Sequence, residues 1–275
     1  MTKLSPTSGV RLLGPADLAT AFELSTIAGW NQTEDDWRML MDLAPQGCFG
    51  IQADGRLVAT ATLLSYGKQA AWIGMVLTRP EYRGRGFGRA LVTHALKSAD
   101  SKEIRTVKLD ATEQGQRLYE RLGFKAEESV ERWSRAGISN LHITAGEFTS
   151  DQLSALDLAA FGADRSALLR KLETRSQVYI GENAYLFARL GRVTAYLGPC
   201  VANDSASAQK IIRAMLQAHS SVAWSWDLLP HNQKAVALAS ELGFTRQRVL
   251  TRMGRGEPLR GRDDMVYAIA GFELG

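Results

Sequence analysis

The hydrophobic and polar positions of this chain alternate between short runs typical of strands and longer stretches with apolar residues at helical spacing. Residues 49–52 and 56–65 are rich in strand-forming residues, and Asp54-Gly55 between them predicts a hairpin turn. Strands that alternate with helices in this way predict an α/β fold. The other elements predicted for the first half are strands at 10–13, 71–77, 106–109 and 126–135, and helices at 18–24, 34–43, 87–96 and 116–122.

The second half of the chain repeats the pattern of the first. A shift of 120 positions places Leu122-Gly123-Phe124 on Leu242-Gly243-Phe244, the strand at 72–77 on 192–197, and Thr112 on Asn232. Three correspondences at one offset indicate a tandem duplication. We therefore expect two domains, at 1–136 and 141–275. The elements predicted for the second are strands at 141–145, 177–180, 184–188 and 224–227, a helix capped by Ser150-Asp151 that reaches Phe161, and a helix at 166–172.

The two halves differ in the number of strands near their ends. The first half has one strand-like segment after Phe124, at 126–135, whereas the second has two, at 246–253 and 265–272. A polar stretch, GRGEPLRGRDD, separates the last two segments. The final segment could complete either sheet, and we assign it to its own domain.

Composition and charge narrow the function classes. The chain has 33 Lys and Arg against 29 Asp and Glu, a net charge of +4, and it lacks long basic runs, so no nucleic-acid partner is expected. Cys48 and Cys200 show no spacing typical of a disulfide framework, which suits a reducing compartment. The N-terminus has no apolar signal region, and no uncharged run is long enough to span a bilayer. We expect a cytoplasmic protein with no membrane partner.

The strongest chemical signal is a loop rich in arginine and glycine between a strand that ends at Leu77 and the helix that follows. Its glycines let the backbone approach a ligand closely, while the N–H groups of the first helical turn point outward and attract an anion. Its arginines favour a diphosphate over a monoanion. The GxxxxGK[ST] and GxGxxG patterns are both absent. This arginine-glycine loop consists of Arg83, Gly84, Arg85, Gly86, Phe87, Gly88 and Arg89.

The spacing RxxGxG, formed by Arg83, Gly86 and Gly88 between a strand and a helix, resembles the pyrophosphate loop of the GCN5-related N-acetyltransferase (GNAT) superfamily. The resemblance implies acetyl-CoA as cofactor and two tandem domains, each a mixed, mostly antiparallel sheet flanked by helices. It also implies that the strand before the loop carries a bulge and splays from its parallel neighbour, so that amides near Met75 can face the oxyanion. The backbones expected to contact the cofactor are those of Val76, Leu77 and Thr78.

A second segment, DATEQGQRLYERLGF at 110–124, is similar to the other cofactor motif of the superfamily. The resemblance assigns Tyr119 as the general acid that protonates the departing thiolate. Its reference pKa of ~10 against ~8.5 for a thiol suits that role without a large perturbation. The alternative is a helix tyrosine with a hydrated hydroxyl. Thr112 stands where many relatives have an asparagine that bonds the pantetheine, and we list it as a cofactor contact.

The acceptor side of the site is less well defined. Family members place the loop between the first two helices over the acceptor pocket, which makes Trp30, Asn31 and Gln32 the candidate acceptor contacts. A core role for Trp30 and a turn role for Asn31 remain open alternatives. His94 is alone on its helix, so no metal is assigned.

No carboxylate lies on the two strands that are expected to splay, so the general base is not identified. The candidates are Asp110, Glu113, Asp35 and Asp36, with a water relay as the alternative. Deprotonating an amine of pKa ~10.4 near pH ~7 costs roughly 4 to 5 kcal/mol, which an apolar pocket and a weak base can share.

The second half lacks the residues that suggest catalysis in the first. At the offset of 120, RGRGFGRA falls on NDSASAQK at 203–210, and Tyr119 falls on Ala239. The second half therefore resembles a degenerate GNAT-like domain. We expect an N-acetyltransferase that moves acetyl directly from acetyl-CoA to a small-molecule amine or another amino group. The alternative is a non-catalytic acyl-CoA sensor whose second half binds a partner. The acceptor and the oligomeric state are left open.

Overall fold

The computed structural model describes residues 9–138 and 151–275. The predicted strand at 141–145, the cap at Ser150 and part of the junction at 137–140 lie outside the described residues. Most other predicted elements are confirmed. The first half contains β1 (Val10–Leu12), α1 (Leu18–Ile27), α2 (Glu34–Leu43), β2 (Cys48–Ala53), β3 (Arg56–Tyr66), β4 (Ala70–Thr78), α3 (Phe87–Ser101), β5 (Thr106–Ala111), α4 (Glu113–Glu120) and β6 (Lys125–Arg135), with 3-10 turns at Pro15–Asp17 and Pro80–Tyr82.

The second half follows the same order. It contains α5 (Asp151–Phe161), α6 (Ser166–Glu173), β7 (Ser176–Gly181), β8 (Ala184–Arg189), β9 (Ala195–Ala202), α7 (Ser205–Ala218), β10 (Trp224–Leu228), α8 (Gln233–Glu241), β11 (Thr245–Gly256) and β12 (Val266–Ala268), with a 3-10 turn at Asp263–Met265. The duplication is also visible in local detail, because Thr112 and Asn232 both cap their helices through the side chain. Gly123 and Gly243 both adopt a left-handed conformation after those helices.

Local signals account for several element boundaries. Thr33 caps α2 by accepting a hydrogen bond from the backbone N–H of Asp36, and the Asp36 carboxylate accepts one from the Thr33 N–H in return. Asp54 and Gly55 both have positive φ, at 50° and 75°, as the predicted hairpin turn requires. These sequence-local features position α2 and the β2–β3 hairpin correctly.

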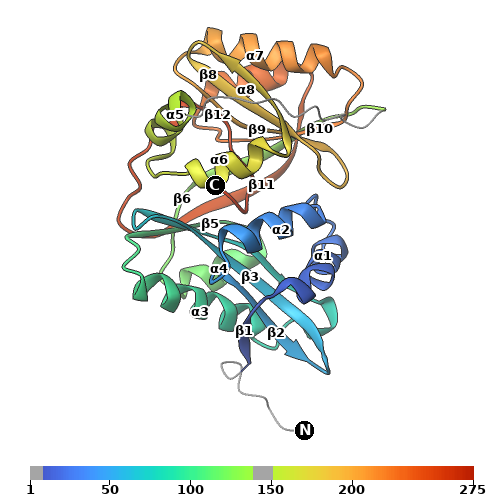
Figure 1. Cartoon of the computed structure of the whole chain (residues 1–275), viewed down its shortest axis with the longest axis vertical. Coiled ribbons are helices and arrows are strands. Elements are labelled where there is room, and N and C mark those ends of the chain that lie inside the picture. Colours follow the sequence, from blue (N-terminus) through green and yellow to red (C-terminus); the bar gives the residue numbers. More distant parts are fainter. Residues whose placement is uncertain (1–8, 139–150) are drawn as a thin grey trace.

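The described strands form one continuous twelve-stranded sheet, in the order β1-β2-β3-β4-β5-β11-β6-β10-β9-β8-β7, with β12 paired to β9. The two halves exchange strands at the middle of this order. β11 of the second half pairs antiparallel with β5, and β6 of the first half pairs antiparallel with β10. β6 and β11 also pair with each other along most of their length (Figure 1). Each half therefore completes the sheet of the other.

The final strand-like segment is shorter than predicted. Only Val266–Ala268 is a strand, and it pairs with β9 of its own half, as we assigned it. The chain then turns at Gly271, whose φ of 150° ends the extended conformation. The last residues, 271–275, run into the space between the halves, where the C-terminus lies in Figure 1.

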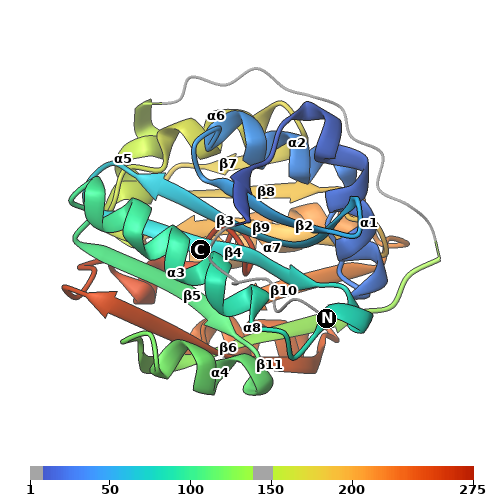
Figure 2. The same cartoon turned by 90° about the horizontal axis from the view of Figure 1, so that it is seen from below.

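Helices pack on both faces of the sheet. Apolar residues of α3 and α4 pack on one face of the first half, and those of α7 and α8 pack on one face of the second (Figures 1 and 2). The opposite faces share a single core that includes residues of α1, α2, α5 and α6. No described helix is long and apolar enough to cross a membrane.

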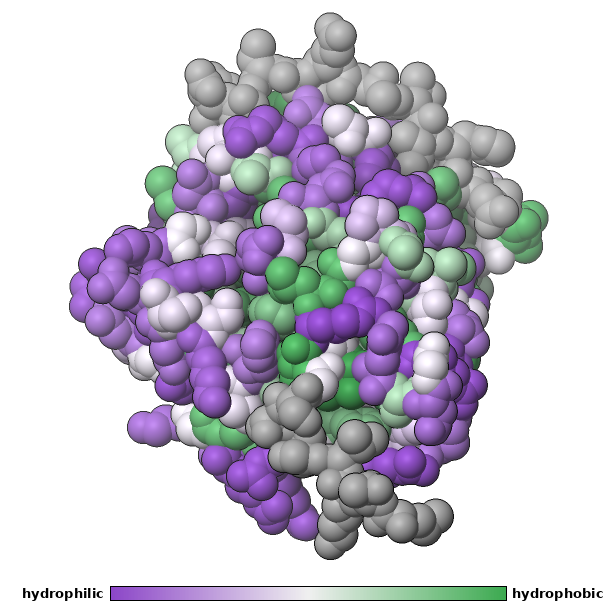
Figure 3. Space-filling view, turned by 60° about the horizontal axis from the view of Figure 1, so that its bottom comes forward, coloured by the Kyte–Doolittle hydropathy of each residue, from purple (hydrophilic) through white to green (hydrophobic). Residues whose placement is uncertain are grey.

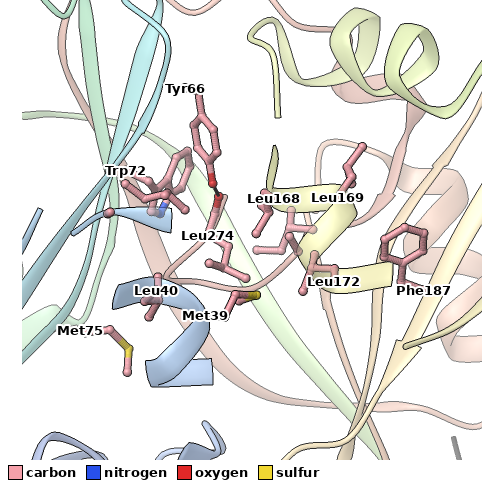
Figure 4. Close-up of a cluster of buried hydrophobic side chains, with 14 of the residues drawn as sticks. Met39, Leu40, Tyr66, Trp72, Met75, Leu168, Leu169, Leu172, Phe187 and Leu274 are labelled. Carbon is pink, nitrogen blue, oxygen red and sulfur yellow. Dashed lines mark hydrogen bonds between the residues drawn. The ribbon is translucent and has the colours of Figure 1, made fainter. Parts of the chain in front are cut away.

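The shared core joins the two halves. Met39 and Leu40 of α2 meet Leu168 and Leu172 of α6, and Leu274 from the C-terminal tail lies among them (Figure 4). The hydroxyl of Tyr66 donates a hydrogen bond to the Leu274 carbonyl. Burial of this apolar surface stabilises both halves together. A hollow with hydrophobic side chains, surrounded by hydrophilic ones, opens on the face shown in Figure 3.

Candidate active site

β4 departs from regular geometry at the point where the site begins. It pairs in parallel with β5 only from Ala70 to Trp72, so the two strands separate beyond that point. The register of β4 against β3 shifts between Gly74 and Leu77, and Met75 has a φ of 49°, rare for a residue with a side chain. The expected bulge and splay are both present. The bulge and the splay leave a gap between β4 and β5 beyond Trp72, while the two strands stay paired from Ala70 to Trp72.

The arginine-glycine loop follows β4 and leads directly into α3. Gly84 and Gly86 have φ values of 75° and 84°, and Gly86 is the N-cap residue of α3. No side chain caps this helix, so its first N–H groups stay available to an anion. A Cβ added at Gly84 or Gly88 would meet no atom within 4 Å, so both glycines leave open space beside the loop.

The three arginines of the loop are exposed and differ in their contacts. Arg83 donates to the Thr78 carbonyl at 3.3 Å, and Arg85 stacks on Tyr82 with 4.7 Å between its guanidinium carbon and the ring centre. The side chain of Arg89 makes no hydrogen bond or ion pair to any described residue. None of the three is paired with a carboxylate among the described residues, so their charge is available for a phosphate. Phe87 is buried and anchors the start of α3.

A cavity of about 320 Å³ lies where the splayed strands meet the second half. It includes the expected Val76 and Thr112 but not Leu77, Thr78 or the arginine-glycine loop, which lie farther along the chain. Both halves therefore contribute to one cavity. The residues that line it are Gly29, Trp30, Asn31, Gln32, Ile73, Gly74, Met75, Val76, Leu109, Asp110, Thr112, Tyr119, Arg132 and Ser134 from the first half, and Val193, Thr194, Ser225, Gln247, Arg248, Leu250, Phe272 and Glu273 from the second.

Tyr119 faces this cavity from α4 and is 8% exposed. Its ring meets Phe124 edge-on, and a Cβ at Gly115 would come within 3.0 Å of it, so the glycine makes room for the ring. Burial raises the pKa of the phenol to about 12. The general-acid role does not require such a rise, and the assignment of Tyr119 stays a prediction. A phenol with this pKa stays protonated and is a better hydrogen-bond donor than proton donor.

Asn31 is a cavity residue whose amide is already used. Its Nδ2 donates to the Thr194 carbonyl at 2.9 Å, and its Oδ1 accepts from the backbone N–H groups of Val193 and Thr194. The amide thus binds the β8–β9 turn of the second half to the first half. Trp30 is half-buried, packs against the shared core and also contacts this turn, through its carbonyl and Arg192. Both residues line the cavity, and their role as acceptor contacts stays a prediction.

Gln32 is placed differently. It is 4% exposed, and its Nε2 donates to Oε2 of Glu273 at 2.9 Å. Its Oε1 is buried in the cavity wall with no hydrogen-bond partner among the described residues. This amide orientation is favoured because the reverse would bring the amide oxygen against the carboxylate. Gln32 therefore lines the cavity and holds Glu273, while its own Oε1 is enclosed by protein.

None of the four predicted carboxylates has the features of a free base. Asp110 lines the cavity, but both of its oxygens are bound by Arg252 at 2.9 and 3.0 Å. Removing Asp110 from that bidentate pair would leave a buried arginine without its partner. Asp36 is occupied by the α2 cap. Asp35 pairs with Arg38 at the surface, and Glu113 is exposed outside the cavity lining.

The carboxylate that sequence reasoning missed is Glu273. It is 3% exposed and lines the cavity from the C-terminal tail. Burial raises its pKa to about 7. One signal could have identified it, because Glu273 is the single charged residue in the apolar segment that ends the chain, YAIAGFELG.

In the second half, the equivalent gap between two splayed strands is occupied by another segment of the same half. β9 and β10 pair in parallel only from Ala195 to Leu197 and then separate, as β4 and β5 do. β12 enters that gap: it pairs with β9, and the N–H of Ile269 donates to the Asp227 carbonyl at 2.9 Å. Asp204 caps α7 by accepting from the Ser207 N–H at 2.8 Å, which puts a carboxylate where the first half has a free helix end.

Comparison with known proteins agrees with this geometry. A model of the acetyltransferase (GNAT) family matches residues 17–124, and a model described as an acetyltransferase (GNAT) domain matches residues 153–268. The chain is 30% identical over 134 residues to glucosamine 6-phosphate N-acetyltransferase of Trypanosoma brucei brucei, an alignment that covers 46% of this chain and 78% of that enzyme. The chain therefore belongs to the GNAT family. It is a GNAT-family acyltransferase with two such domains in tandem.

Two further relatives extend this result. An uncharacterized N-acetyltransferase of Bacillus subtilis, YitH, is 33% identical over 159 residues, which is 54% of each protein, so the match spans about half the length of that relative. The crystal structure of a Pyrococcus horikoshii protein superposes with a TM-score of 0.84 at 22% identity, over 97% of this chain and 95% of that one. The tandem arrangement therefore occurs as a complete fold in a solved structure.

Proposed function

We propose that this protein transfers an acetyl group from acetyl-CoA directly to an amine, with the reaction confined to the first half. The family typically uses acyl-CoA. The observation that carries the proposal is the combination of a splayed strand pair, an uncapped helix behind the arginine-glycine loop, and an adjoining cavity. The second half has the same splay but contains β12 and Asp204 there, which supports the interpretation of a domain that has lost cofactor binding.

The residues of the first half fit the two ends of the cofactor. The N–H groups at the start of α3 and the free arginines suit a diphosphate, and the gap beside Val76 suits the pantetheine arm with its thioester. Thr112 uses its hydroxyl oxygen to cap α4 through the Gly115 N–H at 3.2 Å. Any contact of Thr112 with the pantetheine therefore has to come from its remaining hydroxyl hydrogen.

Direct attack by the amine agrees with the side chains of the cavity. Among the described lining residues, there is no cysteine, and the serines Ser134 and Ser225 have no histidine in the lining to activate them. Tyr119 donates a hydrogen bond toward the sulfur that departs as the carbon–sulfur bond breaks. Glu273 is the lining carboxyl group that suits an incoming ammonium, because Asp110 is bound by Arg252.

The experiment is a thiol-release assay with acetyl-CoA and a panel of amines. Arg248 lines the cavity, and its side chain makes no hydrogen bond or ion pair among the described residues. Because this guanidinium could bind an anionic group of the acceptor, the panel includes amino acids and amino sugar phosphates as well as polyamines. Amine-dependent thiol release with formation of the N-acetyl product is expected. The sensor alternative predicts tight CoA binding without thiol release for every amine. Absence of thiol release across a panel that includes peptides would contradict the proposal.

A further inference from the structure

We propose that Glu273, which the C-terminal tail of the second half carries into the cavity of the first, is the base that accepts a proton from the attacking amine. This inference rests on the proposed function and deepens it. It gives the second half a chemical role at a site whose cofactor contacts all come from the first.

The tail is held in place on both sides of Glu273. The Trp72 indole donates to the Phe272 carbonyl at 2.9 Å, and the Tyr66 hydroxyl donates to the carbonyl of Leu274, which is itself fully buried in the shared core. Against β4, a Cβ at Gly74 would lie 2.8 to 2.9 Å from the Cβ, Cα and carbonyl oxygen of Glu273. Glu273 therefore packs directly on the bulged stretch of β4, where the thioester carbonyl is expected.

The carboxylate is positioned by a polar partner. Gln32, itself 4% exposed, donates its Nε2 hydrogen to Oε2 of Glu273 at 2.9 Å. Gln32 thus orients the base beside the cavity that both residues line.

The environment sets Glu273 apart from ordinary surface glutamates. Its burial disfavours the charged form, Arg189 and Arg132 favour it, and Asp36 opposes it, with the net result of a pKa of about 7. Such a group is deprotonated in a large fraction of molecules at neutral pH and can still bind a proton. The charged and titratable side chains around it are Arg189 on β8, Arg132 on β6, Asp36 on α2, and the phenols of Tyr66 and Tyr196.

The nitrogen of the acceptor loses two protons in the transfer. An ammonium acceptor gives one proton to the Glu273 carboxylate, and the nitrogen lone pair then forms the bond to the thioester carbon. The carbon–sulfur bond breaks, and its electron pair leaves on the sulfur, which accepts a hydrogen bond from Tyr119. The second proton lost by the nitrogen ends on that sulfur, and Glu273 releases the first to solvent. The products are an amide, CoA thiol and one proton.

The test compares the wild type with Glu273→Gln in the full chain. The substitution keeps the shape and the hydrogen bond to Gln32 while removing the base. With acetyl-CoA and the fastest amine of the panel, kcat should fall by ~10²- to 10⁴-fold. The rise of kcat with pH through about 7 should disappear. CoA affinity in calorimetry should be unchanged, because Glu273 is not part of the arginine-glycine loop.

The matched control is Glu128→Gln. Glu128 is a carboxyl on β6 whose pKa is also raised by burial, but it does not line the cavity. This variant should keep the kcat and the pH profile of the wild type. A Glu273→Gln variant that retains the wild-type rate and pH dependence would overturn the assignment, as would an equal loss in the Glu128→Gln control.

A second measurement does not depend on the acceptor. The carboxyl carbon of Glu273 can be followed by NMR in protein labelled with 13C-glutamate, with Glu273→Gln used to assign the signal. A titration midpoint near 7 in the presence of CoA is expected. A midpoint at the ordinary glutamate value of ~4.3 would contradict the proposal. Failure of the proposed function would be seen separately, as absence of thiol release by the wild type with every amine.

Discussion

Tyr119 illustrates how burial changes the role of a single side chain. With its pKa raised to about 12 by burial, the phenol is a weaker acid than a thiol of ~8.5, so complete proton transfer to the thiolate is uphill. We predict that it contributes a hydrogen bond to the charge that develops on sulfur. Losses of ~10²- to 10³-fold in kcat are typical when such a donor is removed.

We therefore expect Tyr119→Phe to lower kcat by that amount, with little change in CoA affinity, because the hydroxyl acts on a charge that is absent from the bound ground state. Steady-state kinetics and calorimetry on the same preparation measure both quantities. Tyr179→Phe is the control, since Tyr179 lies on β7 outside the cavity and bonds His219 at 3.0 Å. An unchanged kcat in Tyr119→Phe would assign Tyr119 to packing alone.

Glu273 has a consequence for stability as well as for rate. A folded pKa of about 7 against an ordinary value of 4.5 means that folding is favoured when the group is protonated. Stability from this group is fully present below about pH 4.5 and is lost as the pH rises through about 7, by an amount on the order of 3 kcal/mol.

Glu273→Gln removes this penalty, because glutamine stays neutral. Relative to the wild type, the melting temperature of the variant should be higher by more at about pH 8 than at about pH 5. Thermal denaturation at the two pH values measures the difference. A difference between variant and wild type that does not vary with pH would contradict the raised pKa.

At the scale of elements, we predict that the contrast between α3 and α7 decides where the cofactor binds. Gly86, with a φ of 84°, is the N-cap residue of α3 and has no side chain to cap it, whereas α7 begins with the Asp204 cap. Valine at position 86 would force a strained backbone and place a branched side chain at the phosphate site. We expect Gly86→Val to abolish CoA binding in calorimetry.

The matched control is Ala206→Val, which lies 120 positions after Gly86 and in the first turn of α7. It should leave CoA binding intact. Loss of CoA binding in this control, or full CoA binding by Gly86→Val, would contradict the assignment of the cofactor to the first half.

The elements were largely predictable because their signals are local. The Thr33 cap, the Asp54-Gly55 turn and the glycines that follow α4 and α8 specify boundaries within a few residues of sequence. The partners of β6 and β11 were not predictable in this way. A strand pattern records which face is buried but not which chain segment lies at its edge, so the exchange between halves was left undecided.

The same limit explains the candidate site. Tyr119 and the arginine-glycine loop lie in continuous motifs, so both could be proposed from the sequence, and their roles stay predictions. Glu273 is separated from Gln32 by 241 positions. The tail reaches the cavity only because the chain turns at Gly271, after β12 has paired with β9. Residue chemistry alone could not distinguish this glutamate from the other carboxylates of the chain.

At the scale of the whole molecule, neither half has a complete sheet of its own. In residues 1–136, β5 and β6 would both lose β11, and β6 would also lose β10. The apolar surface that α2 buries against α6 and Leu274 would be exposed. Open edges and uncovered apolar faces promote aggregation.

We therefore expect residues 1–136 alone to be poorly soluble, without a cooperative melting transition, and inactive. Melting curves, CoA affinity and amine turnover compared with the full chain measure this. Co-expression of residues 137–275 supplies β10, β11 and Glu273 from a separate chain and should recover folded protein. A monomeric fragment 1–136 with full turnover would contradict both the structural and the chemical role of the second half.

The central claim is that one of the two GNAT domains binds the cofactor and the other completes its site. The most direct measurement is the stoichiometry of CoA binding to the full chain by calorimetric titration. Our account predicts one CoA for each chain, because the second slot contains β12 and the α7 terminus carries Asp204. Two equivalents for each chain, or none, would contradict it.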